Sequence, residues 1–269
     1  MKAGTTTLFD HLAGHPAVAA SSDKEPKYFA RDHVYAKGPD WYATLWDWDP
    51  STHAIAMEAS THYSFRHIHP ETAERMTAHP GEFRLVYLVR EPVARVESHY
   101  HHALAAGWKV ADQPLGEDLH RDLVEPCRYA WQLDAFAAQF PRSSILVLTF
   151  DELVTDTEGT VERVLAHWDL PVDGLALDTD LVRNSSSSKV VSTRVHTARR
   201  MPGSAWLSDR LSPATRRRIK GLIGAGTEAH RLDAATRAAL RAELAEDHRR
   251  LAGEWDVNVG GWPAADAAD

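Results

Sequence analysis

The chain has 269 residues, of which 43% are hydrophobic and 25% charged, an ordinary composition for a globular protein. Its formal net charge of −8 argues against a general affinity for nucleic acid, and no apolar run approaches the ~20 residues of a membrane helix. The one cysteine, Cys127, cannot form an internal disulfide, and nothing at the N-terminus resembles a signal peptide. We therefore expect a single domain over residues 1–269 in the reducing cytoplasm, with neither nucleic acid nor a membrane as partner.

The first residues predict an anion-binding loop, in which a lysine and a glycine precede three threonines. These residues are Lys2, Ala3, Gly4, Thr5, Thr6 and Thr7. Glycine permits a tight turn, and the first amides of a helix carry partial positive charge, so a phosphate can bind there with Lys2 as its counter-charge. A Walker A loop instead has its lysine after the second glycine, so an ATPase loop is not indicated. A basic tail with a threonine helix cap is the alternative.

Residues 5–15 show helical spacing of apolar side chains, and residues 17–20 predict a short strand that leads to Lys24 and Glu25. At the carboxyl end of a parallel strand, a carboxylate faces the crevice where such sheets bind ligands. Glu25 could then act as a general base on an acceptor hydroxyl. The alternative is a surface glutamate paired with Lys24 or Lys27.

A second strand is predicted over residues 53–58, and Glu58 and His62 follow it as rival bases. The alternative for this pair is a hydrogen-bonded loop carboxylate and an ordinary exposed histidine. The preceding segment, residues 40–47, is rich in aromatic side chains. These rings could stack on a sugar or an aromatic acceptor, but packing inside the protein is favoured.

A short helix over residues 70–79 and an apolar strand over residues 83–89 come next, and Arg90 ends that strand. The helix that begins near Val93 carries Ser98. An arginine fork and a serine hydroxyl together suit a phosphate group. His99 and His102 share a face of this helix, yet no further metal ligands accompany them, so we expect no metal.

The remaining chain predicts helices over residues 115–140, 158–168, 213–223 and 234–255, with a buried strand over residues 144–150. A polar, serine-rich stretch interrupts this pattern at residues 183–189. On composition alone it is a flexible loop.

Three of these stretches, taken in order, resemble the sulfotransferases that use 3′-phosphoadenosine 5′-phosphosulfate (PAPS). They are the loop at residues 2–7, KEPKYF at residues 24–29, and the strand, turn and helix at residues 85–100. KEPKYF is similar to a segment of the heparan sulfate sulfotransferase branch and its bacterial relatives. The resemblance implies a three-layer, P-loop-like α/β fold with a mostly parallel central sheet and helices on both faces.

The resemblance also implies roles for the motif residues. The loop at residues 2–7 would bind the 5′-phosphosulfate, Arg90 and Ser98 the 3′-phosphate, and the polar stretch would close over the nucleotide. Lys189 and Arg194 are the candidate cations of that lid. The implied reaction is in-line transfer of a sulfuryl group to a hydroxyl, or an amine, of a carbohydrate or small-molecule acceptor.

In that reaction Glu25 takes the acceptor proton, Lys2 and the threonine donors stabilise the departing phosphate, and 3′,5′-bisphosphoadenosine is released without a metal. Lys24, Lys27, Glu58 and His62 would lie on the acceptor side. The family usually has histidine where Lys27 stands, so acceptor contacts there are expected to differ.

One departure concerns the start of the chain, because the family has a hydrophobic strand directly before the phosphate loop and Met1 stands where it should end. We expect translation to begin upstream. Two other functions remain open: a P-loop kinase, which the position of Lys2 disfavours, and a non-catalytic module that binds a bisphosphate nucleotide or a sulfated glycan. Neither the acceptor nor the oligomeric state follows from the sequence.

Overall fold

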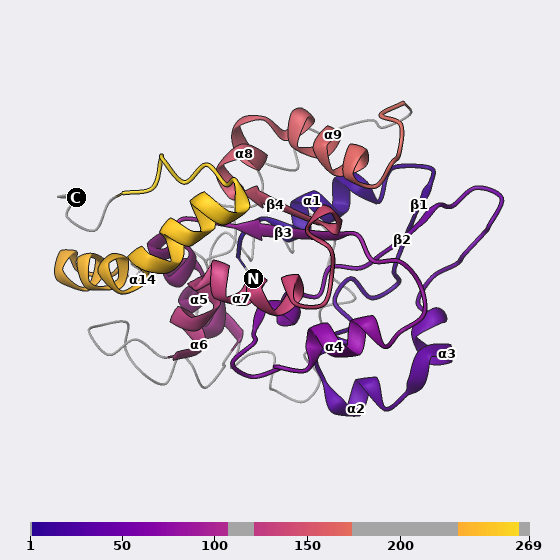
Figure 1. The fold of residues 1–269 in the computed structure, drawn as a ribbon, viewed down its shortest axis with the longest axis horizontal. Helices are drawn as coiled ribbons and strands as arrows, with labels where there is room; N and C mark the ends of the chain where they lie inside the picture. Colours follow the sequence, from indigo (N-terminus) through magenta and orange to yellow (C-terminus); the bar gives the residue numbers. More distant parts are fainter. Residues whose placement is uncertain (1, 107–120, 174–230, 264–269) are drawn as a thin grey trace, which may run out of the picture.

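The structure is a computed structural model that describes residues 2–106, 121–173 and 231–263 (Figure 1). The strands are β1 (Val18–Ala20), β2 (Ile55–Met57), β3 (Leu85–Val89) and β4 (Ile145–Thr149). The helices before β4 are α1 (Thr5–Leu12), α2 (Asp32–Tyr35), α3 (Gly38–Ala43), α4 (Thr72–Thr77), α5 (Pro92–Ala106), α6 (Arg121–Val124) and α7 (Tyr129–Ala137). After β4 come α8 (Phe150–Thr155), α9 (Thr157–His167) and α14 (Ala234–Trp255). Short 3-10 turns are η1 (Thr61–Ser64), η3 (Glu125–Cys127) and η4 (Arg142–Ser144).

The strands pair in parallel, as the sequence predicts, but within the described residues they form two two-stranded sheets instead of one central sheet. In one pair β1 lies beside β2 with Val18 opposite Ile55, and in the other β3 lies beside β4 with Leu85 opposite Ile145. Parallel strands point their carboxyl ends the same way, so the polar residues that follow the two strands of a pair emerge at one edge.

Helices cover both faces of the β3–β4 pair, which confirms the expected layered α/β arrangement (Figure 1). Leu85 and Tyr87 pack into the cluster that contains α5, α7 and α14, whereas Val86 and Leu88 pack into the cluster that contains α1, α8 and α9. Successive side chains of a strand point to opposite faces, so an uninterrupted apolar run is what a doubly covered strand requires.

The prediction of one helix over residues 115–140 is wrong for residues 121–140, the part that the structure describes. From Arg121 the chain instead forms α6, the turn η3 and then α7. Pro126 lies in η3, and a proline inside a helix would lack the amide hydrogen that the ladder needs. The predicted helix over residues 213–223 lies outside the described residues, and the one over 234–255 is confirmed as α14.

The aromatic segment at residues 40–47 packs mainly inside the protein, as favoured above. Tyr42 is buried and stacks on Tyr28 with 4.2 Å between ring centroids. Trp46 donates its indole hydrogen to the Met57 carbonyl at 3.1 Å. These contacts fasten the loop after α3 to the end of β2.

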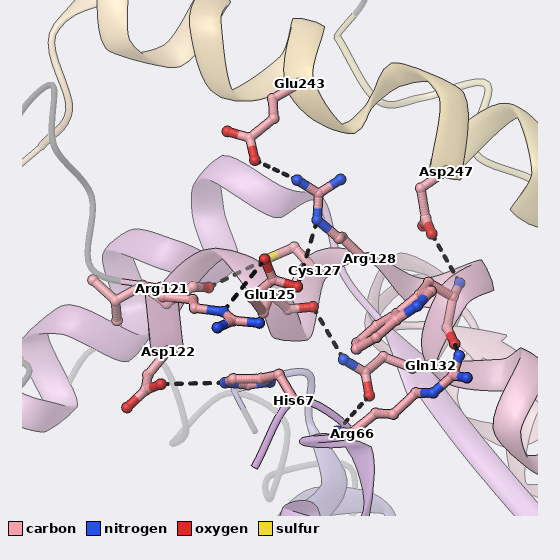
Figure 2. A network of polar contacts seen from close by, with 12 residues as sticks. Arg66, His67, Arg121, Asp122, Glu125, Cys127, Arg128, Gln132, Glu243 and Asp247 are labelled. Atoms are coloured by element: carbon pink, nitrogen blue, oxygen red, sulfur yellow. Dashed lines mark hydrogen bonds and ion pairs between the residues drawn. The ribbon is translucent and has the colours of Figure 1, made fainter. Parts of the chain in front are cut away.

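Helix α14 is joined to the α6–α7 region by a network of polar contacts (Figure 2). Arg128 pairs with Glu243, and Arg250 of α14 pairs with Asp134 at 2.8 Å. Asp247 accepts hydrogen bonds from the Ala130 and Trp131 amides at 3.0 and 2.8 Å, so it caps the start of α7 from another helix. No helix within the described ranges combines the length and hydropathy needed to cross a membrane.

Candidate functional site

The loop before α1 is shaped around Gly4. Its φ of 90° is left-handed, and a Cβ added there would lie 2.9 Å from side-chain carbons of both Phe150 and Leu153. Glycine is therefore required on two grounds, backbone conformation and contact. Because α1 begins at Thr5 directly after Gly4, its cap residue has no side chain to bond the first amides of the helix, an arrangement that suits an anion.

Arg90 meets this loop, although 88 residues separate it from Lys2. Its guanidinium donates to the Lys2 carbonyl at 3.1 Å and lies over the Phe150 ring, 4.5 Å from the centroid. Burial lowers the pKa of Arg90, and the nearby Tyr129 and Asp151 oppose that shift. Arginine stays charged throughout the physiological range, so a partly buried cation stands beside the predicted phosphate loop.

Ser98 lies on α5 and is partly exposed, next to the buried His99. The pKa of His99 is lowered to about 2, first by burial and then by cations that include Arg95 and Lys2. Lys2 is thus close enough to α5 for its charge to act there. The Arg90 contact thus brings the first loop to the end of β3, whereas the role of Ser98 in a phosphate site stays a prediction.

Glu25 lies just beyond β1, where its carboxylate is held from two sides. Thr61 donates its hydroxyl to Oε2 at 3.0 Å, and Lys24 pairs with Oε1 at 3.2 Å. Burial would raise the pKa of Glu25, but Lys24 and the Thr61 hydrogen bond outweigh it, so the pKa falls below its ordinary value. Glu25 is therefore an ionised carboxylate at neutral pH and able to accept a proton.

Lys24 connects this carboxylate to the phosphate loop. Its ammonium group lies 5.7 Å from the centroid of the Phe9 ring on α1, and it also donates to the Ala59 carbonyl at 3.4 Å. The same lysine thus touches the helix that follows Gly4 and the loop that follows β2. The predicted acceptor-side residue Lys24 and the helix after the predicted phosphate loop consequently lie in one region of the molecule.

Glu58 is the hydrogen-bonded loop carboxylate of the alternative interpretation. It accepts bonds from the Ser60 amide at 2.7 Å, from the Tyr63 hydroxyl and from the Tyr42 hydroxyl at 3.3 Å. Burial raises the pKa of Glu58, and these donors oppose the shift. Its oxygens are engaged in holding the loop after β2, which favours a structural role.

His62 is a neutral imidazole rather than an ordinary exposed one. Burial, followed by the charges of Lys27 and Arg31, lowers its pKa to about 4. Arg31 can only donate, so its 3.4 Å contact makes Nε2 of His62 the acceptor and places the proton on Nδ1. The ring nitrogen that could take a proton is therefore already engaged, which favours Glu25 over His62 as a base.

The sequence predictions missed three contributors to this site: Thr61, Arg31 and Tyr129. Thr61 had a usable signal, because the parallel pairing of β1 and β2 places the residues after each strand side by side. Arg31 and Tyr129 reach the site only through tertiary packing.

The predicted residue Lys27 is held through its backbone amide, which donates to the Ser60 hydroxyl at 2.8 Å.

Lys189 and Arg194, the predicted lid cations, lie outside the described residues. Among the residues that the structure describes, no group of three or more histidine, cysteine or acidic side chains is arranged to hold a metal ion.

Comparison with known proteins identifies the family. Residues 1–217 match the family model of the sulfotransferase domain. The chain belongs to the sulfotransferase domain family. This sulfotransferase-family chain also has the fold of a sulfotransferase from Alicyclobacillus acidocaldarius, with a TM-score of 0.62 at 21% identity over 97% of this chain and 94% of that one.

Two curated relatives are similar to part of the sulfotransferase-family chain. Mouse heparan sulfate glucosamine 3-O-sulfotransferase 3B1 is 30% identical over 177 residues, which cover 61% of this chain and 42% of the relative. The membrane-associated sulfotransferase kil1 of Dictyostelium discoideum is 36% identical over 135 residues, covering 47% and 28% respectively. The chain thus spans less than half the length of either relative.

We predict that Gly4→Ala disrupts the phosphate loop. A methyl group there meets Phe150 and Leu153 at 2.9 Å, and the left-handed backbone adds strain, so we expect a loss of about 1–3 kcal/mol in the free energy of unfolding. Urea denaturation measures this loss. Gly38→Ala is the matched control, because Gly38 also has a left-handed φ, 82°, but open space around its Cβ position. Equal losses in the two variants would contradict the role of the contacts.

We predict that His62 makes the protein less stable in mild acid. Its pKa of about 4 lies below the unfolded value of 6.5, so the stability that it confers is complete above pH 6.5 and is lost as the pH falls toward 4. Between pH 7 and pH 5 the free energy of unfolding should therefore fall by about 1–2 kcal/mol less in His62→Gln than in the wild type, as measured by urea denaturation. The exposed His33→Gln serves as control. An unchanged pH dependence in His62→Gln would count against the assignment.

Proposed function

We propose that this chain transfers a sulfuryl group from PAPS to a hydroxyl group of a carbohydrate or small-molecule acceptor. The observation that carries the proposal is the contact of Arg90 with the Lys2 carbonyl beside Gly4. It joins the two motifs that would hold the two phosphate ends of the donor, and Lys24 extends the same region to Glu25. Family membership supports the class of reaction.

The residues fit a doubly phosphorylated donor. A Cβ at Gly4 would collide with Phe150 and Leu153, the Gly4 cap makes no side-chain bond to the start of α1, and Lys2 and Arg90 supply two cations. PAPS would supply an activated sulfuryl group on the 5′-phosphate. Lys2, Ala3 and the Gly4 to Thr7 segment would hold the 5′ end, and Arg90 with Ser98 the 3′-phosphate.

In the proposed reaction Glu25 accepts the proton of the acceptor hydroxyl as the oxygen bonds to sulfur and the bond from sulfur to the phosphate oxygen breaks. Lys2 and the Thr5 to Thr7 donors balance the negative charge left on that phosphate, and 3′,5′-bisphosphoadenosine departs. Thr61 and Lys24 hold the Glu25 carboxylate in one orientation. Charge neutralisation by these groups would take the place of a divalent metal.

The acceptor side favours a carbohydrate with a negative charge. Lys27 and Arg31 both act electrostatically on His62, close to the loop that carries Thr61, and Lys24 adds a third cation beside Glu25. The name of the mouse relative describes a heparan sulfate glucosamine sulfotransferase. These observations support an acceptor that carries a carboxylate or sulfate group near the reacting hydroxyl.

We further propose that residues 1–269 act as one domain in a reducing, cytoplasmic compartment. The family match covers residues 1–217, and α14 beyond it packs back onto α7 through Asp247 and Arg250. Cys127 is a buried free thiol, which suits a reducing setting.

We predict that the chain binds 3′,5′-bisphosphoadenosine more tightly than adenosine 5′-monophosphate in calorimetric titration without metal. Arg90→Ala should weaken binding of the bisphosphate about 10- to 100-fold, because a charged donor to the 3′-phosphate is lost. The affinity for the monophosphate should stay nearly unchanged. Arg84→Ala is the matched control, since Arg84 lies just before the same strand and pairs with Asp169 on the surface. Equal affinity of the wild type for the two nucleotides would refute the donor site.

We predict that Glu25→Gln lowers kcat about 10²- to 10⁴-fold, because glutamine cannot take the acceptor proton, while the affinity for 3′,5′-bisphosphoadenosine stays unchanged. Transfer of label from ³⁵S-PAPS to heparan sulfate measures turnover, and the exposed Glu82→Gln is the control. Full activity in Glu25→Gln together with a large loss in His62→Gln would reassign the base. Binding without any turnover in the wild type, on this acceptor and on small alcohols and phenols, would support a non-catalytic module.

A further inference from the structure

Arg90 is the first residue beyond the β3–β4 ladder, which ends with Val89 opposite Thr149. Its peptide groups therefore lack sheet partners, and buried peptide groups need others. Tyr129 supplies them, since its hydroxyl donates to the Arg90 carbonyl at 2.6 Å and accepts from the Arg90 amide at 3.4 Å. One phenol oxygen thus contacts both polar groups of the residue that carries the guanidinium.

Tyr129 itself has little freedom to move. It is 1% exposed and is the first residue of α7, whose start is capped by Asp247 of α14 through the Ala130 and Trp131 amides (Figure 2). Arg128 is the residue before α7, and its side chain makes no capping bond within the described structure. The Asp247 carboxylate takes that role instead. The position of the phenol therefore depends on where α14 lies.

Aromatic side chains from the C-terminal region enclose the phenol ring. His248 stacks on Tyr129 at 5.8 Å between ring centroids, and Trp262 packs against it at 6.0 Å. Both rings are held by hydrogen bonds. His248 donates to the Cys127 carbonyl at 3.2 Å, and the Trp262 indole donates to the Asp151 carboxylate at 3.3 Å. Asp151 follows Phe150, the ring beneath Arg90. The C-terminal region thus contacts Tyr129, which bonds the Arg90 peptide groups, and Asp151, which follows the ring beneath Arg90.

We propose that Tyr129 is a positioning residue that sets the affinity of Arg90 for the 3′-phosphate of the donor nucleotide. The inference rests on the proposed function, because it takes Arg90 to be the 3′-phosphate ligand. Through the carbonyl and amide of Arg90, the Tyr129 hydroxyl fixes the Cα from which the guanidinium reaches between Phe150 and the Lys2 carbonyl. Helix α14 and Trp262, far away in sequence, thereby contribute to donor binding without touching the donor.

The test compares Tyr129→Phe with the wild type by calorimetric titration of 3′,5′-bisphosphoadenosine and adenosine 5′-monophosphate. We expect the dissociation constant of the bisphosphate to rise about 3- to 10-fold, the range of one neutral hydrogen bond, and that of the monophosphate to stay unchanged. Tyr87→Phe is the matched control. Tyr87 lies on β3, and its ring packs 6.4 Å from Tyr129, but its neighbouring hydroxyl partner is Ser64.

A double-mutant comparison separates positioning from a general loss of structure. If Tyr129 acts through Arg90, then Tyr129→Phe should have no further effect on bisphosphate affinity in an Arg90→Ala background. An equal loss for both nucleotides, an unchanged bisphosphate affinity, or a full additional loss in the double variant would each overturn the assignment. If the wild type itself does not prefer the bisphosphate, the proposed donor site is refuted along with the role of Tyr129. If the wild type prefers it and only the Tyr129→Phe result differs from expectation, the role of Tyr129 alone is refuted.

Discussion

The close approach of the Gly4 backbone to the start of α8 is the constraint on which the proposed site depends. Phe150 and Leu153 occupy the space where a Cβ would stand, so the first loop lies directly against the end of β4. Phe150 also supports the Arg90 guanidinium, which in turn bonds to Lys2. The first loop, the end of β3 and the end of β4 are thereby held as one unit.

The strand pairs provide the rigid base for this unit. Because β3 and β4 alternate their side chains between two apolar clusters, helices are held on both faces and neither strand can slip by one residue without exposing apolar surface. The capping box of Thr149 and Glu152 then begins α8 immediately after β4. The turn that carries Phe150 is thus fixed by short-range hydrogen bonds and does not rely on the loop that packs on it.

Three candidate bases of similar appearance in the sequence have different environments in the fold. Glu25 is kept ionised by Lys24 and Thr61, Glu58 is tied down by three donors, and His62 is kept neutral by burial and two cations. What separates these side chains is their charge and hydrogen-bonding environment, which combines near neighbours such as Lys24 and Ser60 with distant ones such as Thr61 and Arg31. Only Glu25 combines an ionised oxygen with a direct link, through Lys24, to the phosphate-loop helix.

Much of this arrangement could be predicted from local sequence, because glycine geometry, apolar periodicity and the parallel-strand rule act over a few residues. The turn at Gly4, the α5 start after Arg90 and the strand that becomes β3 are of this kind. The broken helix around Pro126 shows where a periodic pattern misled, since periodicity does not register a missing amide hydrogen. Tertiary structure alone decided which bases are engaged and that Tyr129, fixed by α14 and Trp262, holds the Arg90 peptide. Those outcomes arise largely from contacts between residues that lie tens of positions apart or more, from Arg31 with His62 to Ala130 with Asp247, and no local pattern specifies them.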